Sequence, residues 1–304
     1  MAKRDFLSLA DLSRDEFEML VKRAIEGKKE WKEGRAKTPM KGKVLGLIFH
    51  KPSLRTRVSF EVGARQLGGS AIYLTDKELG IGSREAVEDV GEVLSRYLDV
   101  IMIRTFDHKI AVDLAANAKA PVINGLTDLF HPCQVLADVQ TIVEHRDTIE
   151  GKVVTFYGDG SNNMAHSWIN AAAVLPFELR IATPSNYLPD AAVMSHAKKC
   201  GAKIVVSHDA KEVSRGADVL YTDVWASMGQ ESERDARIRE MMPYQINAEA
   251  LALAKKDALV LHCLPAHRGE EVTADVIDGP HSVIYDEAEN RLHAQKAIIE
   301  WLLA

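Results

Sequence analysis

The stretch from Ser53 to Arg57 combines two arginines and two hydroxyl side chains. It follows a short apolar run at 44–49, which is typical of a buried parallel strand, and it opens a helical pattern of apolar residues. Ser53 is therefore expected to cap a helix whose first N–H groups lack intrahelical partners and whose dipole favours a dianion. Arg55 and Arg57 are two residues apart and cannot face the same way, so we expect Arg55 to face the anion. The stretch predicts a phosphate site, although alone it would also fit a solvated basic helix start.

A second helix start is predicted at His131, where Pro132 occupies a first-turn position that tolerates its missing N–H. His131 and Gln134 are three residues apart, so they share a helix face and can both donate to one oxygen. Donors of this kind polarise a carbonyl group as charge develops on it. The alternative is a capped helix that contains an ordinary, satisfied histidine.

Polar residues also follow two strands predicted in the second half of the chain. The turn at 158–163 lacks the third glycine of a dinucleotide-binding fingerprint, because Asn163 stands in its place. A loop that binds a small carboxylate fits better, and a tight strand-to-helix turn is the alternative. Asp223 is a candidate to hold an ammonium group or to cap a helix. The segment from Asp223 to Glu231 has the mixed composition of loops that cover substrates.

The segment from His262 to Val272 is the densest in reactive residues. Cys263 is a possible nucleophile, but on a strand the adjacent His262 points to the opposite face, so no Cys–His pair follows. His262, Cys263 and His267 also lack the usual spacing of metal ligands. We expect Cys263 to position a substrate or accept a proton, with a small buried hydrophobe as the alternative.

The elements that must position these residues follow a βαβ rhythm, which restarts after a long helical pattern from His131 to about residue 150. Further helices are expected at 13–29 and at 286–304. The expected strands are 44–49, 71–74, 100–104, 121–123, 153–157, 179–183, 203–206, 218–222, 259–262 and 283–285. Ligands of open α/β sheets bind at the carboxyl ends of the strands, where the polar residues above and Arg104 lie. The pattern predicts two parallel α/β domains and one shared cleft.

Composition excludes several classes of protein. The formal net charge of -6 argues against a nucleic-acid binder, which usually carries a basic surplus. The three cysteines are widely spaced and suggest a reducing compartment rather than a disulfide framework or a zinc cluster. No secretory signal or membrane-spanning window is seen, so a cytoplasmic protein that does not bind a membrane is expected.

Taken in chain order, these motifs resemble those of the ornithine carbamoyltransferases in the aspartate/ornithine carbamoyltransferase family. The resemblance covers nearly the whole chain and includes Ser95-Arg96-Tyr97, Met102-Ile103-Arg104-Thr105 and Asp286-Glu287-Ala288-Glu289-Asn290-Arg291. Two positions depart from the family pattern. Leu54 replaces the usual threonine, and Gly80 stands where many relatives carry a glutamine that reaches into a neighbouring subunit's site.

The resemblance implies two Rossmann-like domains with parallel sheets, joined by interdomain helices and assembled as a homotrimer or a multiple of trimers. A carbamoyl phosphate-binding domain would span 1–148, with 286–304 returning to it, and an ornithine-binding domain would span 149–285. By resemblance, carbamoyl phosphate binds Ser53, Leu54, Arg55, Thr56, Arg104, His131, Gln134, Cys263, Leu264 and Arg291. Ornithine binds Asn163, Asp223, Ser227 and Met228 by the same resemblance. The catalytic residues implied are Arg104, His131, Asp223, Cys263 and Arg291.

The activity implied is transfer of the carbamoyl group of carbamoyl phosphate to the side-chain amine of L-ornithine, giving L-citrulline and phosphate in arginine metabolism. Carbamoyl phosphate already carries a good leaving group, so neither a metal nor another cofactor is expected. The amine resembles that of lysine, with a pKa of about 10.4, and must lose a proton before it attacks. Asp223 and Cys263 are the expected groups for this step, and the departing phosphate is the alternative acceptor.

Three other functions remain open at this stage. The first is the same chemistry on another amine, such as putrescine or an acylated ornithine. The second is a non-catalytic homologue that only binds phosphate compounds, which would have no need of residues directed at a carbonyl. The third is a nicotinamide-dependent dehydrogenase, against which the missing glycine at Asn163 counts.

Overall fold

The structure is a computed structural model that describes residues 3–75, 79–82, 84–226 and 234–304. The chain forms two compact units, Met1–Gln140 with Glu289–Ala304, and Thr141–Ala288. The divisions fall inside two helices, α6 (Pro132–Arg146) and α13 (Ile284–Leu303). The sequence predicts the first division inside or just after the helical pattern at 131–150, with domain bounds drawn after residues 148 and 285.

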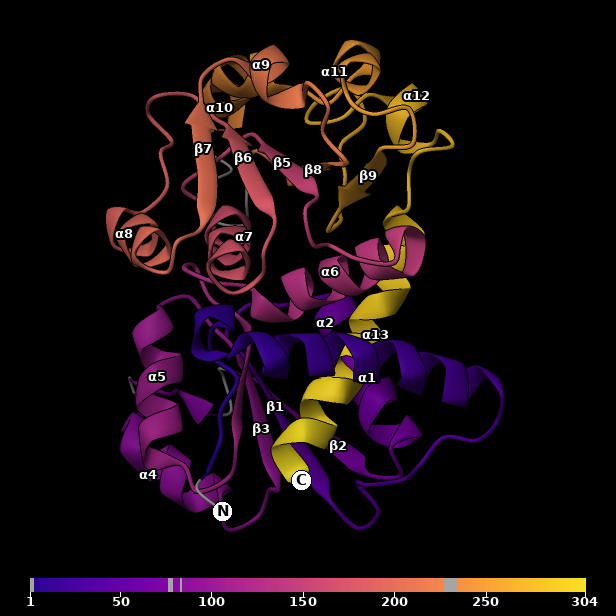
Figure 1. The fold of residues 1–304 in the computed structure, drawn as a ribbon. Helices are drawn as coiled ribbons and strands as arrows, with labels where there is room; N and C mark the ends of the chain where they lie inside the picture. The colour runs from indigo at the N-terminus through magenta and orange to yellow at the C-terminus, as the bar shows by residue number, and fades with distance from the viewer. Residues whose placement is uncertain (1–2, 76–78, 83, 227–233) are drawn as a thin grey trace. The chain divides into compact units, whose positions relative to one another are not determined.

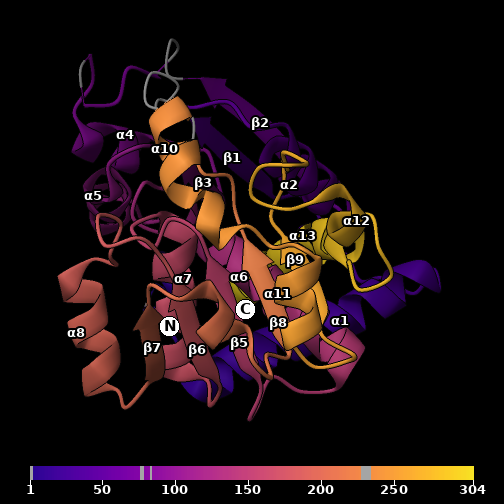
Figure 2. The ribbon, with the colours of Figure 1, turned by 90° about the horizontal axis from the view of Figure 1, so that it is seen from above.

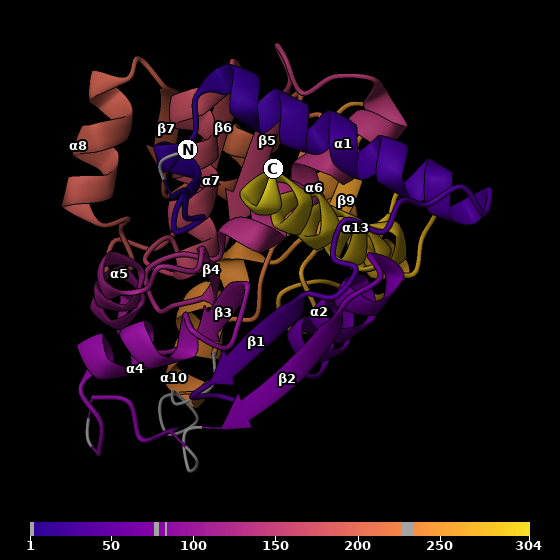
Figure 3. The same ribbon diagram turned by 90° about the horizontal axis from the view of Figure 1, so that it is seen from below.

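The first unit is built on a four-stranded parallel sheet in the order β2-β1-β3-β4 (Figure 3). Its strands are β1 (Val44–Phe49), β2 (Ser70–Thr75), β3 (Val100–Arg104) and β4 (Val122–Leu126). Every residue of β3 and β4 is buried, as expected of parallel strands that helices cover on both faces.

Helices cover both faces of this sheet. Ile101 and Ile103 pack in one apolar cluster with Leu114, and this cluster includes residues of α4 (Val87–Leu94) and α5 (His108–Asn117). Three further helices of the unit pack on one another: α1 (Arg14–Lys32), α2 (Leu54–Gln66) and α13. Lys28 Nζ of α1 donates to Asn290 Oδ1 of α13 at 2.8 Å, and Lys296 Nζ of α13 donates to Gln66 Oε1 of α2 at 2.9 Å. Figure 3 shows α1 and α13 running beside each other.

The second unit holds a five-stranded parallel sheet in the order β7-β6-β5-β8-β9 (Figure 2). Its strands are β5 (Val153–Tyr157), β6 (Glu178–Ala182), β7 (Lys203–Ser207), β8 (Val219–Thr222) and β9 (Leu259–His262). This order places three strands to one side of the chain crossover and two to the other, as in a doubly wound Rossmann fold.

Neighbouring residues of β8 show how the helices of this unit divide between the two faces. Tyr221 contacts Trp168 of α7 (Asn163–Val174), with ring centroids 5.4 Å apart. Leu220 points the other way, into an apolar cluster with Val213 and Val276. Val213 belongs to α9 (Ala210–Ser214), and Val276 belongs to α12 (Ala274–Ile277). The remaining helices, shown in Figure 1, are α8 (Ala191–Lys199), α10 (Arg234–Met241) and α11 (Ala248–Leu253).

The predicted fold class, two parallel-sheet α/β domains, is confirmed. Nine predicted strands are present within the described residues, but the tenth, at 283–285, is wrong. There Ser282 makes only an isolated bridge with Val260, and α13 begins at Ile284. Asp286 and Glu287 lie in the first turn of α13, where acidic groups favour a helix start over a strand.

Candidate active site

Both groups of predicted site residues lie where the strand order of a sheet reverses. In the first sheet this point lies between β1 and β3. Ser53 comes shortly after the end of β1, and Arg104 is the last residue of β3. In the second sheet it lies between β5 and β8. The turn 158–163 follows β5, and Asp223 follows β8. Crevices at such points are the usual ligand sites of doubly wound sheets.

The start of α2 has the geometry that an anion site needs. Ser53 has extended backbone angles, and its Oγ accepts the N–H of Thr56 at 3.3 Å, so it is the helix cap. Arg57 turns away from the cap, because its Nε donates to Glu61 Oε1 at 2.9 Å and its guanidinium lies 3.9 Å from the ring centre of Tyr73. This orientation of Arg57 is consistent with the prediction that Arg55 and Arg57 face different directions and that Arg57 does not face the anion.

His131 lies in a strongly positive environment. Its pKa is well below its ordinary value, first because the ring is buried and second because cations surround it. These cations are Arg291, Arg104, Lys51 and Arg55. The ring is consequently neutral near pH 7, with one N–H to donate and one nitrogen to accept. Four cations brought together from separate elements create a potential that a dianion would relieve.

Arg291 links the cap of α2 to the start of α6. Its guanidinium donates from Nη1 to Gln134 Oε1 and from Nη2 to Thr56 Oγ1 at 3.3 Å. Gln134 in turn donates from Nε2 to Asp138 Oδ1 at 2.7 Å, and these side chains are buried. Arg291 is therefore held at the predicted phosphate site and is not the surface arginine that its isolated position in the sequence would suggest.

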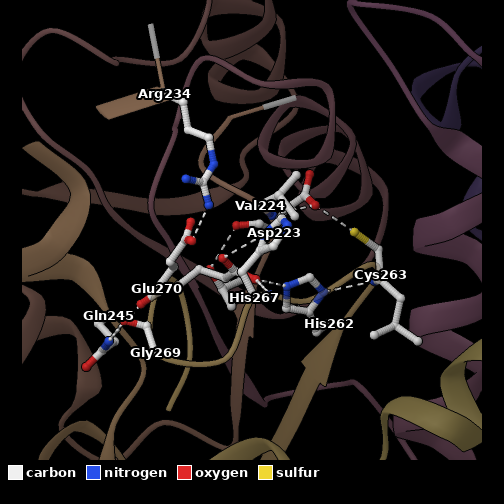
Figure 4. A network of polar contacts seen from close by, with 12 residues as sticks. Asp223, Val224, Arg234, Gln245, His262, Cys263, His267, Gly269 and Glu270 are labelled. Carbon is white, nitrogen blue, oxygen red and sulfur yellow. Dashed lines mark hydrogen bonds and ion pairs between the residues drawn. The ribbon is translucent and has the colours of Figure 1, made fainter. Parts of the chain in front are cut away.

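In the second unit, Asp223 and Cys263 form a direct pair (Figure 4). Cys263 Sγ donates to Asp223 Oδ1 at 2.9 Å, and the N–H of Val224 donates to the same oxygen at 2.7 Å. Burial raises the pKa of the Asp223 carboxyl above its ordinary value. A half-buried carboxylate with a raised pKa beside a thiol is a suitable acceptor for the proton of an amine.

His262 does not pair with Cys263, as predicted from the alternation of side chains along β9. Its Nδ1 accepts the N–H of Leu264 at 2.9 Å, so its Nε2 carries the proton and donates to Glu271 Oε1 at 3.1 Å. Leu264 has a positive φ of 57°, which residues other than glycine rarely adopt. Glu271 is 0% exposed. The His262–Glu271 pair therefore holds the backbone immediately after Cys263 in a sparsely populated conformation.

Two functional neighbours were missed from the sequence. Lys51 is buried, its Nζ donates to Asp128 Oδ1 at 2.6 Å, and it is one of the cations around His131. Its position two residues before the Ser53 cap was the signal for it. The second missed residue is Glu271. The sequence alone does not distinguish it from the adjacent Glu270, because only the fold shows that Glu271 is the buried one of the two.

The remaining predicted residues have different outcomes. Leu54 is 77% exposed and begins α2, so its backbone lies at the cap. Asn163 is the first residue of α7, directly after the Asn162 cap. Ser227 and Met228 lie outside the described residues. None of the described helices is long and apolar enough to cross a bilayer.

The three residues considered as metal ligands from the sequence, His262, Cys263 and His267, do not share all their partners. Cys263 bonds to Asp223, whereas His262 bonds to Glu271. A different group, His267, Glu270 and Glu271, brings its ligand atoms within 4.8 Å of one another. Glu270 is already ion-paired with Arg234.

Comparisons with known proteins cover both units. The carbamoyl-P binding domain of the aspartate/ornithine carbamoyltransferase family matches residues 4–144, and the Asp/Orn binding domain of that family matches residues 150–302. The chain is 52% identical over 298 residues to an ornithine carbamoyltransferase of Nitrosococcus oceani, which covers 98% of the chain and 97% of the relative. It is 53% identical over 302 residues to that of Syntrophus aciditrophicus, covering 99% and 100%.

Solved structures give the same result. The ornithine carbamoyltransferase of Pyrococcus furiosus superimposes with a TM-score of 0.94 at 48% identity, covering 98% of this chain and 96% of that one. The anabolic ornithine carbamoyltransferase of Campylobacter jejuni superimposes with a TM-score of 0.92 at 40% identity, covering 98% of each chain.

Proposed function

Because the chain belongs to the aspartate/ornithine carbamoyltransferase family, we propose how its own residues divide the work of the family reaction. The chain transfers the carbamoyl group of carbamoyl phosphate to the side-chain amine of L-ornithine, giving L-citrulline and phosphate. The resemblance seen in the sequence is thereby confirmed. The roles below are the proposal.

The first unit binds carbamoyl phosphate. The observation that carries this assignment is the neutral His131 with Arg55, Arg104, Lys51 and Arg291 around it, beside the capped start of α2. The backbone N–H of Leu54, the side chains of Ser53 and Thr56 and the guanidinium of Arg55 hold the phosphate dianion.

The carbonyl of the carbamoyl group is activated by neutral His131 together with Gln134 and Arg291. Gln134 and Arg291 already contact each other, so they are held in place before the reaction begins. As the tetrahedral oxyanion forms, the nearby cations stabilise it. Cys263 and Leu264 complete the proposed contacts with this substrate.

The second unit binds ornithine. Asp223 recognises the reacting ammonium group and takes its proton, with Cys263 orienting the carboxylate through the 2.9 Å hydrogen bond. Asn163, at the start of α7, binds the amino-acid end of the substrate. Ser227 and Met228 are proposed as further contacts with ornithine.

A substrate panel tests the function. The purified chain should form citrulline from carbamoyl phosphate and ornithine, and at least about 100-fold less ureido product from putrescine, acetylornithine or aspartate. Putrescine and acetylornithine lack the free amino-acid end of ornithine, and aspartate lacks its side-chain amine, so each leaves a recognition group without its partner. Product is measured colorimetrically and by mass spectrometry. A preference for putrescine or acetylornithine would assign a different amine, and no ureido product from any amine would refute carbamoyl transfer.

We also propose a homotrimer, or a multiple of trimers, as the assembly. A row of apolar side chains on α2, spaced four residues apart, supports self-association: Leu54 is 77% exposed, Val58 47% and Val62 37%. Val58→Lys should lower the mass measured by light scattering from that of the trimer toward that of the monomer. Val112→Lys on α5, at a valine that is 42% exposed, is the matched control. An unchanged mass for Val58→Lys would remove α2 from the interface.

The proposed setting is the cytoplasm and arginine biosynthesis. Cys263 can donate to Asp223 only as a free thiol, which a reducing compartment maintains. The ureido group of citrulline is one amination step from the guanidinium of arginine, so the product is suited to that synthesis.

A further inference from the structure

Arg237 is a buried arginine that the proposed mechanism does not use. It lies on α10 and is 6% exposed. Its Nε donates to the backbone carbonyl of Trp225 at 2.6 Å, and its Nη2 forms an ion pair with Asp159 Oδ2. Its guanidinium also lies 4.7 Å from the ring centre of Tyr187. One side chain thus contacts three segments that are distant in sequence.

Asp159 connects Arg237 to the turn that follows β5. While its Oδ2 faces Arg237, its Oδ1 accepts both the N–H of Ser161 at 2.8 Å and the hydroxyl of Ser161 at 2.6 Å. The turn then leads into Asn162, whose Oδ1 accepts the N–H of Ala165 at 2.8 Å and caps α7. The Asp159 carboxylate therefore fixes the turn that presents Asn163.

Trp225 connects Arg237 to the end of β8, two residues after Asp223. Its buried indole lies against Gly158, where an added Cβ would stand 3.0 Å from Trp225 Nε1. Gly158 has a φ of 110°, which only glycine adopts readily. The exits of β5 and β8 are therefore packed directly together, and Arg237 bonds to both.

We propose that Arg237 is the positioning residue of the ornithine subsite, setting the distance between Asn163 and Asp223 without contacting the substrate itself. The inference deepens the proposed function and rests on it, since ornithine is taken as the ligand of those two residues. Arginine suits this position because its planar guanidinium donates along two fixed directions, to a carbonyl and to a carboxylate. Lysine offers the same charge at a single point and cannot hold both groups in this geometry.

Arg237→Lys is the test. Ornithine KM should rise by at least about tenfold, because one directed, charge-assisted hydrogen bond is lost. The Kd for carbamoyl phosphate, measured by calorimetry, should stay within about twofold of wild type. Arg239→Lys, at an exposed arginine on the same helix, is the matched control and should change neither constant.

A second variant separates positioning from general stability. Asp159→Asn should raise ornithine KM in the same way. The KM of the Arg237→Lys, Asp159→Asn double variant should not exceed that of the more impaired single variant, because both changes break the same contact, the Arg237–Asp159 ion pair. Additive losses, equal losses for both substrates, a melting temperature that falls with KM unchanged, or failure of both single variants to fold would each overturn the proposal. A wild-type chain that makes no citrulline would instead refute the function on which the proposal rests.

Discussion

Replacing Arg55 by alanine is expected to weaken carbamoyl phosphate binding and to lower kcat/KM for this substrate by about 10- to 100-fold. A charge-assisted hydrogen bond to a dianion contributes about 1.5 to 3 kcal/mol, which corresponds to this range. Arg55 lies in the first turn of α2, beside the Ser53 cap, and its charge is among those that depress the pKa of His131. Calorimetry with carbamoyl phosphate and steady-state kinetics on the folded variant measure the effect.

Arg57→Ala supplies the matched control, because it removes the same side chain two residues further along the same helix. Arg57 is exposed, ion-paired with Glu61 and stacked on Tyr73, so its loss should leave both constants within about twofold of wild type. Equal losses in the two variants would indicate a diffuse basic surface. A normal affinity in Arg55→Ala would remove the phosphate assignment at α2.

The fold was predictable because its signal is local. Each buried parallel strand is a short apolar run, and two of the predicted helix starts carry their own side-chain caps, at Ser13 and Ser53. The strand predicted at 283–285 failed where this signal is ambiguous: three hydrophobic residues, Val283 to Tyr285, precede Asp286 and Glu287, and these acidic residues lie in the first turn of a helix.

The chemistry of the site was predictable only as residue types. Arg291 reads as an ordinary surface arginine in the sequence, and only the packing of α13 on α2 brings it to Thr56. The ion pair between Asp159 and Arg237 spans 78 positions along the chain, so no spacing rule reveals it. The sequence left Asp159 open between a tight turn and a carboxylate-binding loop, and the structure shows its carboxylate accepting from Ser161 within the turn.

Asp223→Asn is expected to lower kcat/KM for ornithine by about 100-fold or more, the usual contribution of a general base, and to leave the Kd of carbamoyl phosphate within about twofold of wild type. Asparagine retains an oxygen at the same place, so it can still accept from Cys263 and from the N–H of Val224. The variant therefore removes the charge and the proton acceptor but preserves the local hydrogen bonds. Equal weakening of both substrates would make Asp223 a structural residue.

The pH dependence gives a second, independent test of the same residue. For wild type, kcat/KM for ornithine should rise from about pH 6 to above pH 8, because the attacking amine must be neutral and its reference pKa is about 10.4. Burial raises the pKa of Asp223, so protonation of this carboxyl begins at a higher pH than for an exposed aspartate and adds to the loss on the acidic side. His131 does not contribute to the pH dependence of kcat/KM between pH 6 and 8, because its pKa is well below its ordinary value and the ring stays neutral there. In Asp223→Asn, the extra acidic loss should disappear while the rise due to the amine remains. A wild-type profile that is flat across this range would contradict both the need for a neutral amine and the assignment of Asp223.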